Sequence, residues 1–91
     1  MSAEIEKTLR ICNKRGLHAR AAAKFVRLAE GRRAEITVSK DGVSVCGTSI
    51  MGLLMLSASK DTEIRISAVG DEAEAVLDEI SALIERRFDE E

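Results

Sequence analysis

The 91-residue sequence predicts an α+β fold in which four antiparallel strands form one sheet and three helices pack on one face of it, in the order β-α-β-β-α-β-α. Four short segments predict strands because apolar and polar residues alternate along them. Three further segments predict helices from apolar residues at helical spacing or from residues that cap helices. The length suffices for one hydrophobic core, so we expect residues 1–91 to form a single domain.

The strands are predicted in order along the chain. Alternation covers residues 5–11, 34–39 and 63–68. Asp41-Gly42 is a hairpin turn signal, and a strand with Val43 and Val45 on one face is expected after it. A loop is expected at 13–16, where glycine would allow a tight approach to the next element.

The helices are predicted with their ends. The first covers residues 19–30, and Gly31 ends it as a C-cap. The second covers residues 50 to about 56, with Thr48 or Ser49 as N-cap. The third starts at Gly70-Asp71, where Asp71 and Glu74 resemble a capping box. Its apolar stripe predicts a buried face made of Ala73, Val76, Leu77, Ile80, Leu83 and Ile84.

Composition excludes several classes of protein. No apolar run approaches the roughly 20 residues that cross a bilayer, and charged residues interrupt the first residues, where a signal peptide would be apolar. We therefore expect a cytoplasmic protein without membrane association. Cys12 and Cys46 form no CxxC pair, so we expect two reduced thiols at partly buried strand positions and neither a metal site nor a cofactor.

Charge is unevenly distributed although the net charge is only −2. Eleven of the sixteen acidic residues lie in 61–91, and nine of the fourteen basic residues lie in 7–33: Lys7, Arg10, Lys14, Arg15, Arg20, Lys24, Arg27, Arg32 and Arg33. A basic region favours phosphate and an acidic docking partner, but an ordinary solvated helix face explains it equally well. Nucleic acid is disfavoured because the pI is about 5.5 and only one aromatic residue, Phe25, lies among the basic ones.

His18 is the only histidine, and it directly precedes the first predicted helix. An imidazole is a neutral nucleophile near neutral pH, and the free N–H groups at a helix N-terminus, here of Ala19 and Arg20, suit a bound phosphate. Arg20 can add a bidentate contact to a phosphoryl group. The alternatives are an exposed loop histidine and an arginine extended into solvent.

The segment Gly16-Leu17-His18-Ala19-Arg20 resembles the active-site motif of the HPr family, the histidine phosphocarriers of the bacterial phosphotransferase system. A second family motif is present at Ser49-Ile50-Met51-Gly52, and length and element order are similar over nearly the whole chain. The resemblance implies an open-faced β-sandwich. It also implies a carrier, and not an autonomous enzyme, whose His18 accepts a phosphoryl group on Nδ1 (the pros nitrogen) from phosphorylated enzyme I. The acceptor is then a histidine of an enzyme IIA-type protein.

Two features bear on the branch of the family. Ala21 stands where many sugar-transport members have proline, which leaves the helix entry less rigid. The segments 53–56 and 88–91 are similar to the nitrogen-related NPr branch, which serves a regulatory relay. Ser49-Ile50-Met51-Gly52 instead resembles members whose serine is phosphorylated by HPr kinase/phosphorylase. The branch therefore stays open.

The second motif has its own alternatives. Ser49 is either a regulatory phosphorylation site or simply an N-cap. Ile50, Leu53 and Leu54 share one helical face directed at the core, although Ile50 sits at the exposed start of the helix and can serve both core and docking. Met51 and Met55 share another face and suit partner docking. The resemblance places Ile50 and Met51 in the docking surface, to which we add Lys24 and Arg27.

Three function classes remain to be compared. A monomeric phosphocarrier accounts for most of these sequence features. The alternative is a regulatory binding module that senses phosphorylation of His18 or Ser49. A small-molecule sensor is disfavoured because the sequence has no glycine-rich ligand loop.

Overall fold

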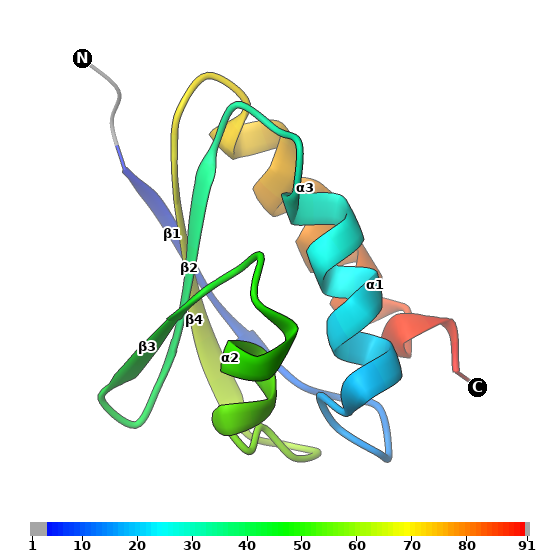
Figure 1. The fold of residues 1–91 in the computed structure, drawn as a ribbon. Coiled ribbons are helices and arrows are strands. Elements are labelled where there is room, and N and C mark those ends of the chain that lie inside the picture. Colours follow the sequence, from blue (N-terminus) through cyan, green and yellow to red (C-terminus); the bar gives the residue numbers. More distant parts are fainter. Residues whose placement is uncertain (1–3, 91) are drawn as a thin grey trace.

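The computed structural model describes residues 4–90, and its elements follow the predicted order (Figure 1). They are β1 (Ile5–Arg10), α1 (Ala19–Ala29), β2 (Glu35–Lys40), β3 (Val43–Cys46), α2 (Ile50–Met55), β4 (Glu63–Val69) and α3 (Ala73–Glu85). A short 3₁₀ turn, η1 (Arg87–Asp89), follows α3 and was not predicted.

The four strands form one antiparallel sheet in the order β1-β4-β2-β3. β4 therefore lies between β1, with Ile5 opposite Ala68, and β2, with Thr37 opposite Ser67. The three helices cover one face of this sheet, and the other face is open (Figure 1). This arrangement confirms the predicted α+β fold and the open-faced β-sandwich.

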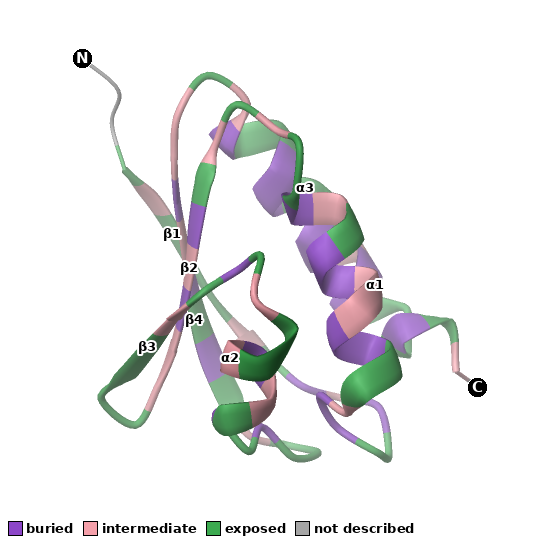
Figure 2. Ribbon diagram, viewed as in Figure 1, coloured by how far each residue is buried: buried purple, intermediate pink, exposed green. Residues whose placement is uncertain are grey.

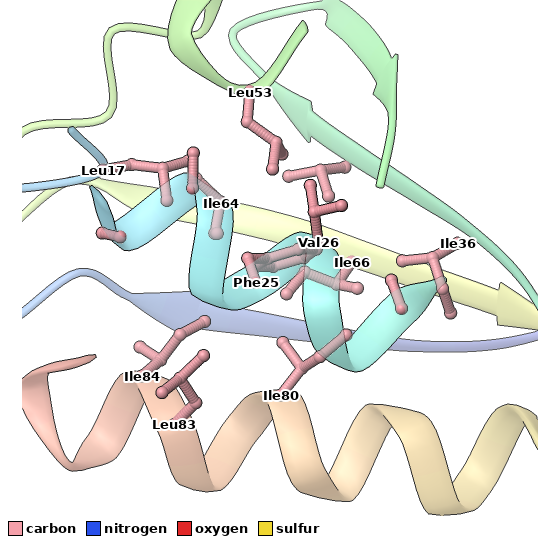
Figure 3. Close-up of a cluster of buried hydrophobic side chains, with 14 of the residues drawn as sticks. Leu17, Phe25, Val26, Ile36, Leu53, Ile64, Ile66, Ile80, Leu83 and Ile84 are labelled. Carbon is pink, nitrogen blue, oxygen red and sulfur yellow. The ribbon is translucent and has the colours of Figure 1, made fainter. Parts of the chain in front are cut away.

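The core lies between the sheet and the helices (Figure 2). The two central strands send alternate side chains into it, Ile36 and Val38 from β2 and Ile64, Ile66 and Ala68 from β4, which is why these strands alternate in sequence. Phe25 and Val26 of α1, Ile80 of α3 and Leu53 of α2 meet over the sheet residues Ile64 and Ile66 (Figure 3). All six residues of the predicted α3 stripe are buried, so the amphipathic pattern is confirmed.

Two turns have the predicted geometry. Asp41 and Gly42 both have positive φ, of 51° and 84°, which matches the twist of a tight hairpin between β2 and β3. Val45 packs against the core beyond this turn, while Val43 is exposed beside it. Gly31 has a φ of 70° directly after the end of α1.

The capping box predicted for Asp71 and Glu74 is wrong. Glu72 is the N-cap of α3 and makes no side-chain cap hydrogen bond. Its carboxylate instead accepts the Arg33 backbone N–H at 2.8 Å, joining the start of α3 to the loop after α1. A contact between distant segments thus overrides the local capping pattern.

The cysteines are free thiols, as predicted, but neither lies at a partly buried strand position. Cys12 is half-buried beyond the end of β1 and donates to Ile84 O at 3.2 Å. Cys46 ends β3 and is exposed, because it lies in the strand at the edge of the sheet.

Candidate functional site

His18 is the N-cap residue of α1, where the extended loop backbone turns into the helix. Its carbonyl accepts the first intrahelical hydrogen bond, from Ala22 N at 2.8 Å, but its imidazole makes no capping bond. The N–H groups of the first helical turn have no acceptor within the helix and mark the positive end of its dipole. The ring therefore lies at the end of α1 that favours an anion.

The loop before His18 is fixed against the segment after α2. Leu17 N donates to Ala58 O at 2.8 Å, and the Leu17 side chain is buried. Gly16 has a φ of 68°, and a Cβ there would lie only 2.5 Å from Ala58 O. Only glycine fits this combination of backbone angle and close approach, so Gly16 sets the approach to His18.

A hollow of about 300 Å³ lies beside the imidazole, lined by Arg15, Leu17, His18, Ser57, Ala58 and Ser59. Its serines directly follow α2, so the end of that helix adjoins the histidine. A second hollow of similar volume lies on the open face of the sheet, between Thr8, Ser39 and Arg65. We place the candidate site at the first hollow because it contains His18, the predicted nucleophile.

Glu90 contacts His18 from the segment that follows α3. Its Oε2 forms a hydrogen bond with His18 Nε2. Its Oε1 accepts from Asn13 Nδ2 at 2.9 Å, and the same Asn13 amide donates to Gly16 O at 2.8 Å. Since both of these contacts are to acceptors, they fix which end of the Asn13 amide carries the nitrogen. The three side chains form one continuous chain ending at the imidazole.

The Glu90 carboxylate is favoured in its charged form. Partial burial acts to raise its pKa, but hydrogen bonds from Asn13 and His18 and the charge of Arg15 outweigh that effect, and the pKa of Glu90 lies below its usual value. Glu90 is thus an anion at neutral pH, facing one nitrogen of the ring.

The segment that carries Glu90 is anchored on both sides. Phe88 is fully buried, and its carbonyl accepts the Lys24 ammonium at 2.6 Å. Arg87, Phe88 and Asp89 all have φ between 55° and 61°, a left-handed conformation that side chains disfavour and that this packing maintains. The segment consequently runs beside the start of α1 (Figure 1).

The basic residues predicted around the histidine differ in their surroundings. Ala19 and Arg20 are exposed in the first turn of α1, next to His18 in sequence, and Arg27 is exposed in its last turn. Lys24 is half-buried and engaged by Phe88 O. Lys7 and Arg32 pair with acidic residues of α3 or of its N-cap. Lys7 and Arg32 of the basic region thus connect β1 and the loop after α1 to α3 and its N-cap.

α2 combines a capped start with an exposed apolar side. Ser49, not Thr48, is the N-cap, and its Oγ accepts Gly52 N–H at 2.9 Å. Met51 and Met55 are more than two-thirds exposed. Leu53 is buried and Leu54 half-buried, as expected for the core side, but Ile50 is 40% exposed, because it begins the helix at its outer end.

Thr48 contacts Cys46. The Thr48 Oγ1 lies 3.0 Å from Cys46 Sγ, and hydrogen bonds from the side chain and backbone of Thr48 lower the pKa of the Cys46 thiol. Thr48, the alternative N-cap in the sequence, thus contacts Cys46 and does not cap α2.

Five residues of the site were not predicted. Ser57, Ala58 and Ser59 line the hollow, and Asn13 and Glu90 contact the imidazole or its partner. Asn13 is fully buried beside Cys12 and Ile11, but nothing in the local sequence distinguishes a buried asparagine from one in an exposed turn. Glu91, part of the predicted branch motif, lies outside the described residues.

Within residues 4–90, none of the helices combines the length and apolar character that a membrane span requires.

Comparison with known proteins identifies the family. The model described as "PTS HPr component phosphorylation site" matches residues 5–86. The phosphocarrier protein NPr of Shewanella violacea is 42% identical over 87 residues, covering 96% of each chain. A solved HPr structure from Thermoanaerobacter tengcongensis is also 42% identical, with a TM-score of 0.91 over 96% of this chain and 98% of that chain. A second structure from that organism, an HPr dimer, is 41% identical, with a TM-score of 0.74 over 88% of this chain and 92% of that chain.

The fold and the matched sequence define a phosphocarrier of the phosphotransferase system. The chain belongs to the HPr family, which includes the proteins called HPr and NPr. Similarity to one NPr and one HPr is equal, at 42% identity, so these two comparisons do not separate the branches.

Proposed function

We propose that His18 is the phosphoryl acceptor of this carrier, taking the group from phosphorylated enzyme I and passing it to a histidine of an enzyme IIA-type protein. The carrier acts in the cytoplasm, as one domain over residues 1–91, and does not catalyse a reaction of its own. The observation that carries the proposal is the position of His18, at the N-cap of α1 beside an open hollow, with one ring nitrogen bound to Glu90.

The transfer step fits this geometry. The lone pair of Nδ1 forms the new N–P bond while the bond between phosphorus and the donor breaks, and the donor keeps that electron pair. The phosphoryl oxygens then face the N–H groups of Ala19 and Arg20 and the Arg20 guanidinium, which offset their charge. Transfer of this kind depends mainly on positioning and charge neutralisation, which a small carrier can supply.

Docking is proposed on the exposed side of α2 and the neighbouring part of α1. Ile50, Met51 and Met55 offer apolar contacts to more than one partner, because methionine side chains adapt to different surfaces. Arg27 adds exposed positive charge. Lys24 contributes to docking only after it releases Phe88 O.

Mass spectrometry of the intact protein tests the proposal. Incubation with enzyme I, phosphoenolpyruvate and magnesium should add one acid-labile phosphoryl group, observed at alkaline pH. The His18→Ala variant should gain none and should still unfold in one cooperative thermal transition, which shows that it is folded. An unmodified wild-type chain, with enzyme I from the same organism, would contradict the proposal.

A regulatory module is the second candidate, supported by the similarity to an NPr and by Ser49. A phosphate on Ser49 would add about −1.5 to −2 charges at the start of α2, beside the docking residues, and would repel an acidic partner. HPr kinase/phosphorylase is the proposed modifying enzyme. Partner binding that survives His18→Ala but is weakened by Ser49→Asp would favour this candidate over a relay alone.

We propose that the carrier is a monomer, since one face must serve two different partners in turn. The dimeric HPr from Thermoanaerobacter tengcongensis shows that the fold also permits pairing. Light scattering at micromolar concentration should give the mass of one chain, about 9.9 kDa.

A further inference from the structure

Nε2, the ring nitrogen of His18 that the proposed transfer step does not use, contacts the carboxylate of Glu90. Glu90 is separated from His18 by 72 residues, yet their side chains form a hydrogen bond through Nε2. The side chain of Glu90 is only 14% exposed and that of His18 only 23%. This contact is therefore a built feature of the site and not a chance encounter of two surface charges.

Several interactions hold Glu90 in place. Asn13 Nδ2 donates to its second oxygen at 2.9 Å, and Asn13 itself is fully buried and bound to Gly16 O. On the other side, the buried Phe88 ring and the Lys24 contact to Phe88 O position the backbone. Each carboxylate oxygen thus has a defined partner, and the His18 ring is oriented by one of them.

We propose that Glu90 is a positioning residue that keeps the proton of neutral His18 on Nε2 and leaves the lone pair on Nδ1 for the phosphoryl group. A neutral imidazole carries one proton, and the nitrogen that faces a carboxylate is the one that keeps it. The other nitrogen is then the nucleophile. The role in transfer rests on the proposed function, whereas the assignment of the proton follows from the contact itself.

The charge balance of the transfer step supports this role. When Nδ1 forms its bond to phosphorus, the Nε2–H remains in place and positive charge develops on the ring. The Glu90 carboxylate lies against that charge and stabilises it. At metal sites, loss of a carboxylate that orients a ligating histidine lowers metal affinity or activity about 10- to 100-fold. We expect loss of the Glu90 carboxylate to lower the rate of phosphoryl transfer about tenfold.

The contact also selects between the two nitrogens. A phosphoryl group on Nε2 would lie against the Glu90 carboxylate, and like charges at contact distance repel. On Nδ1 it is separated from Glu90 by the ring. Glu90 thus excludes the wrong product as well as favouring the right one.

Nitrogen NMR of the imidazole tests the assignment without any partner protein. In ¹⁵N-histidine-labelled full-length protein at alkaline pH, the wild type should show a protonated Nε2 and an unprotonated Nδ1. Glu90→Gln should give an intermediate pattern, because its single amide oxygen replaces the two carboxylate oxygens that accept from Asn13 and His18. Glu90→Ala should shift the two signals toward the average of a free imidazole. Glu85→Gln, on the exposed side of α3, is the matched control.

Phosphorylation rates complete the test. With enzyme I and phosphoenolpyruvate, Glu90→Ala should be about tenfold slower than the wild type and Glu90→Gln intermediate, with Glu85→Gln unchanged. An unchanged NMR pattern in Glu90→Ala would overturn the proton assignment, and an unchanged rate would overturn the positioning role. If the wild type itself is not phosphorylated, the proposed function fails, whereas the NMR result still decides the assignment.

Discussion

The two ends of α1 are both tied to the region of α3, but by contacts of different kinds. Beyond its C-terminal end, Arg32 donates to both oxygens of Glu79 at 3.0 Å and to Glu72 at 3.2 Å. At its N-terminal end, the ties are the His18–Glu90 hydrogen bond and the Lys24 contact to Phe88 O. The first set joins permanently charged groups to carboxylates. The second includes the imidazole of His18, the proposed phosphoryl acceptor.

This difference separates a structural link from one that we propose to be functional. The hydrogen bonds of Glu79 and Glu72 hold the pKa of Arg32 above its ordinary value, so this end keeps its charge at every pH the protein meets. Under the proposed function, the imidazole end changes its charge as His18 gains and loses a phosphoryl group. Similar pairing thus stabilises the fold at one end and, by our proposal, prepares phosphoryl transfer at the other.

The largest effect is expected from Phe88→Ala, which removes the anchor of the segment that carries Glu90. Deleting a fully buried aromatic side chain should lower the free energy of unfolding by about 3–5 kcal/mol. Chemical denaturation measures that loss. Phe25→Ala, equally buried, should cost a similar amount but leave the imidazole NMR pattern unchanged, whereas Phe88→Ala should alter it.

Asn13→Ala should have the next largest effect, about 2 kcal/mol, because Gly16 O and Glu90 each lose a buried donor. The variant should also slow phosphorylation of His18, since Glu90 loses its support. Ser81→Ala removes another buried polar side chain, on α3, and serves as the control. Equal phosphorylation rates in the two variants would show that Asn13 has no part in the site.

Arg20→Lys tests the exposed guanidinium at the functional end. Lysine keeps the charge but loses the planar pair of donors that fits a phosphoryl group. We expect transfer to slow about tenfold, equal to about 1.4 kcal/mol in the barrier, with stability unchanged. Arg65→Lys, on the open face of the sheet, should transfer at the wild-type rate, and so would Arg20→Lys if its side chain only extends into solvent.

Arg32→Ala should have the smallest effect, a loss of a few degrees in unfolding midpoint with normal transfer. The pKa of Glu72 is lowered by the Arg33 N–H and by Arg32, and that of Glu79 by Arg32. Carboxylates with a lowered folded-state pKa stabilise the fold at neutral pH and lose that contribution as the pH falls through the lowered value. The difference between wild type and variant should therefore shrink in acid, and a constant difference from neutral pH to pH 3 would contradict the assignment.

The sequence predicted what depends on local patterns. Strands and helices were recognisable because each has one face on the core and one outside, as in β4 and α3. His18 was recognisable because glycine, histidine and the helix start are adjacent in the chain. Ser49 was recognisable as a possible N-cap for the same reason, since its side chain accepts from an N–H only three residues away, that of Gly52.

The contacts that complete the site could not be predicted in this way. Glu90 and His18 are 72 residues apart, and no periodicity relates an acidic residue near one end to a histidine near the other. The left-handed turn at 87–89 contains no glycine to indicate it. Glu72 was missed as N-cap for a similar reason, because Arg33 claims its carboxylate from a distant loop.

The strand order has a consequence for how the protein is made. β1 leaves the ribosome first, but its neighbour in the sheet is β4, so β1 has to wait for residues 63–69 before it can pair. The contact between His18 and Glu90 has to wait longer still. Contacts between distant parts of a chain form slowly and late. A chain still being synthesised therefore carries its histidine without the contacting carboxylate until residue 90 has been made, and its sheet stays incomplete until β4 has been made.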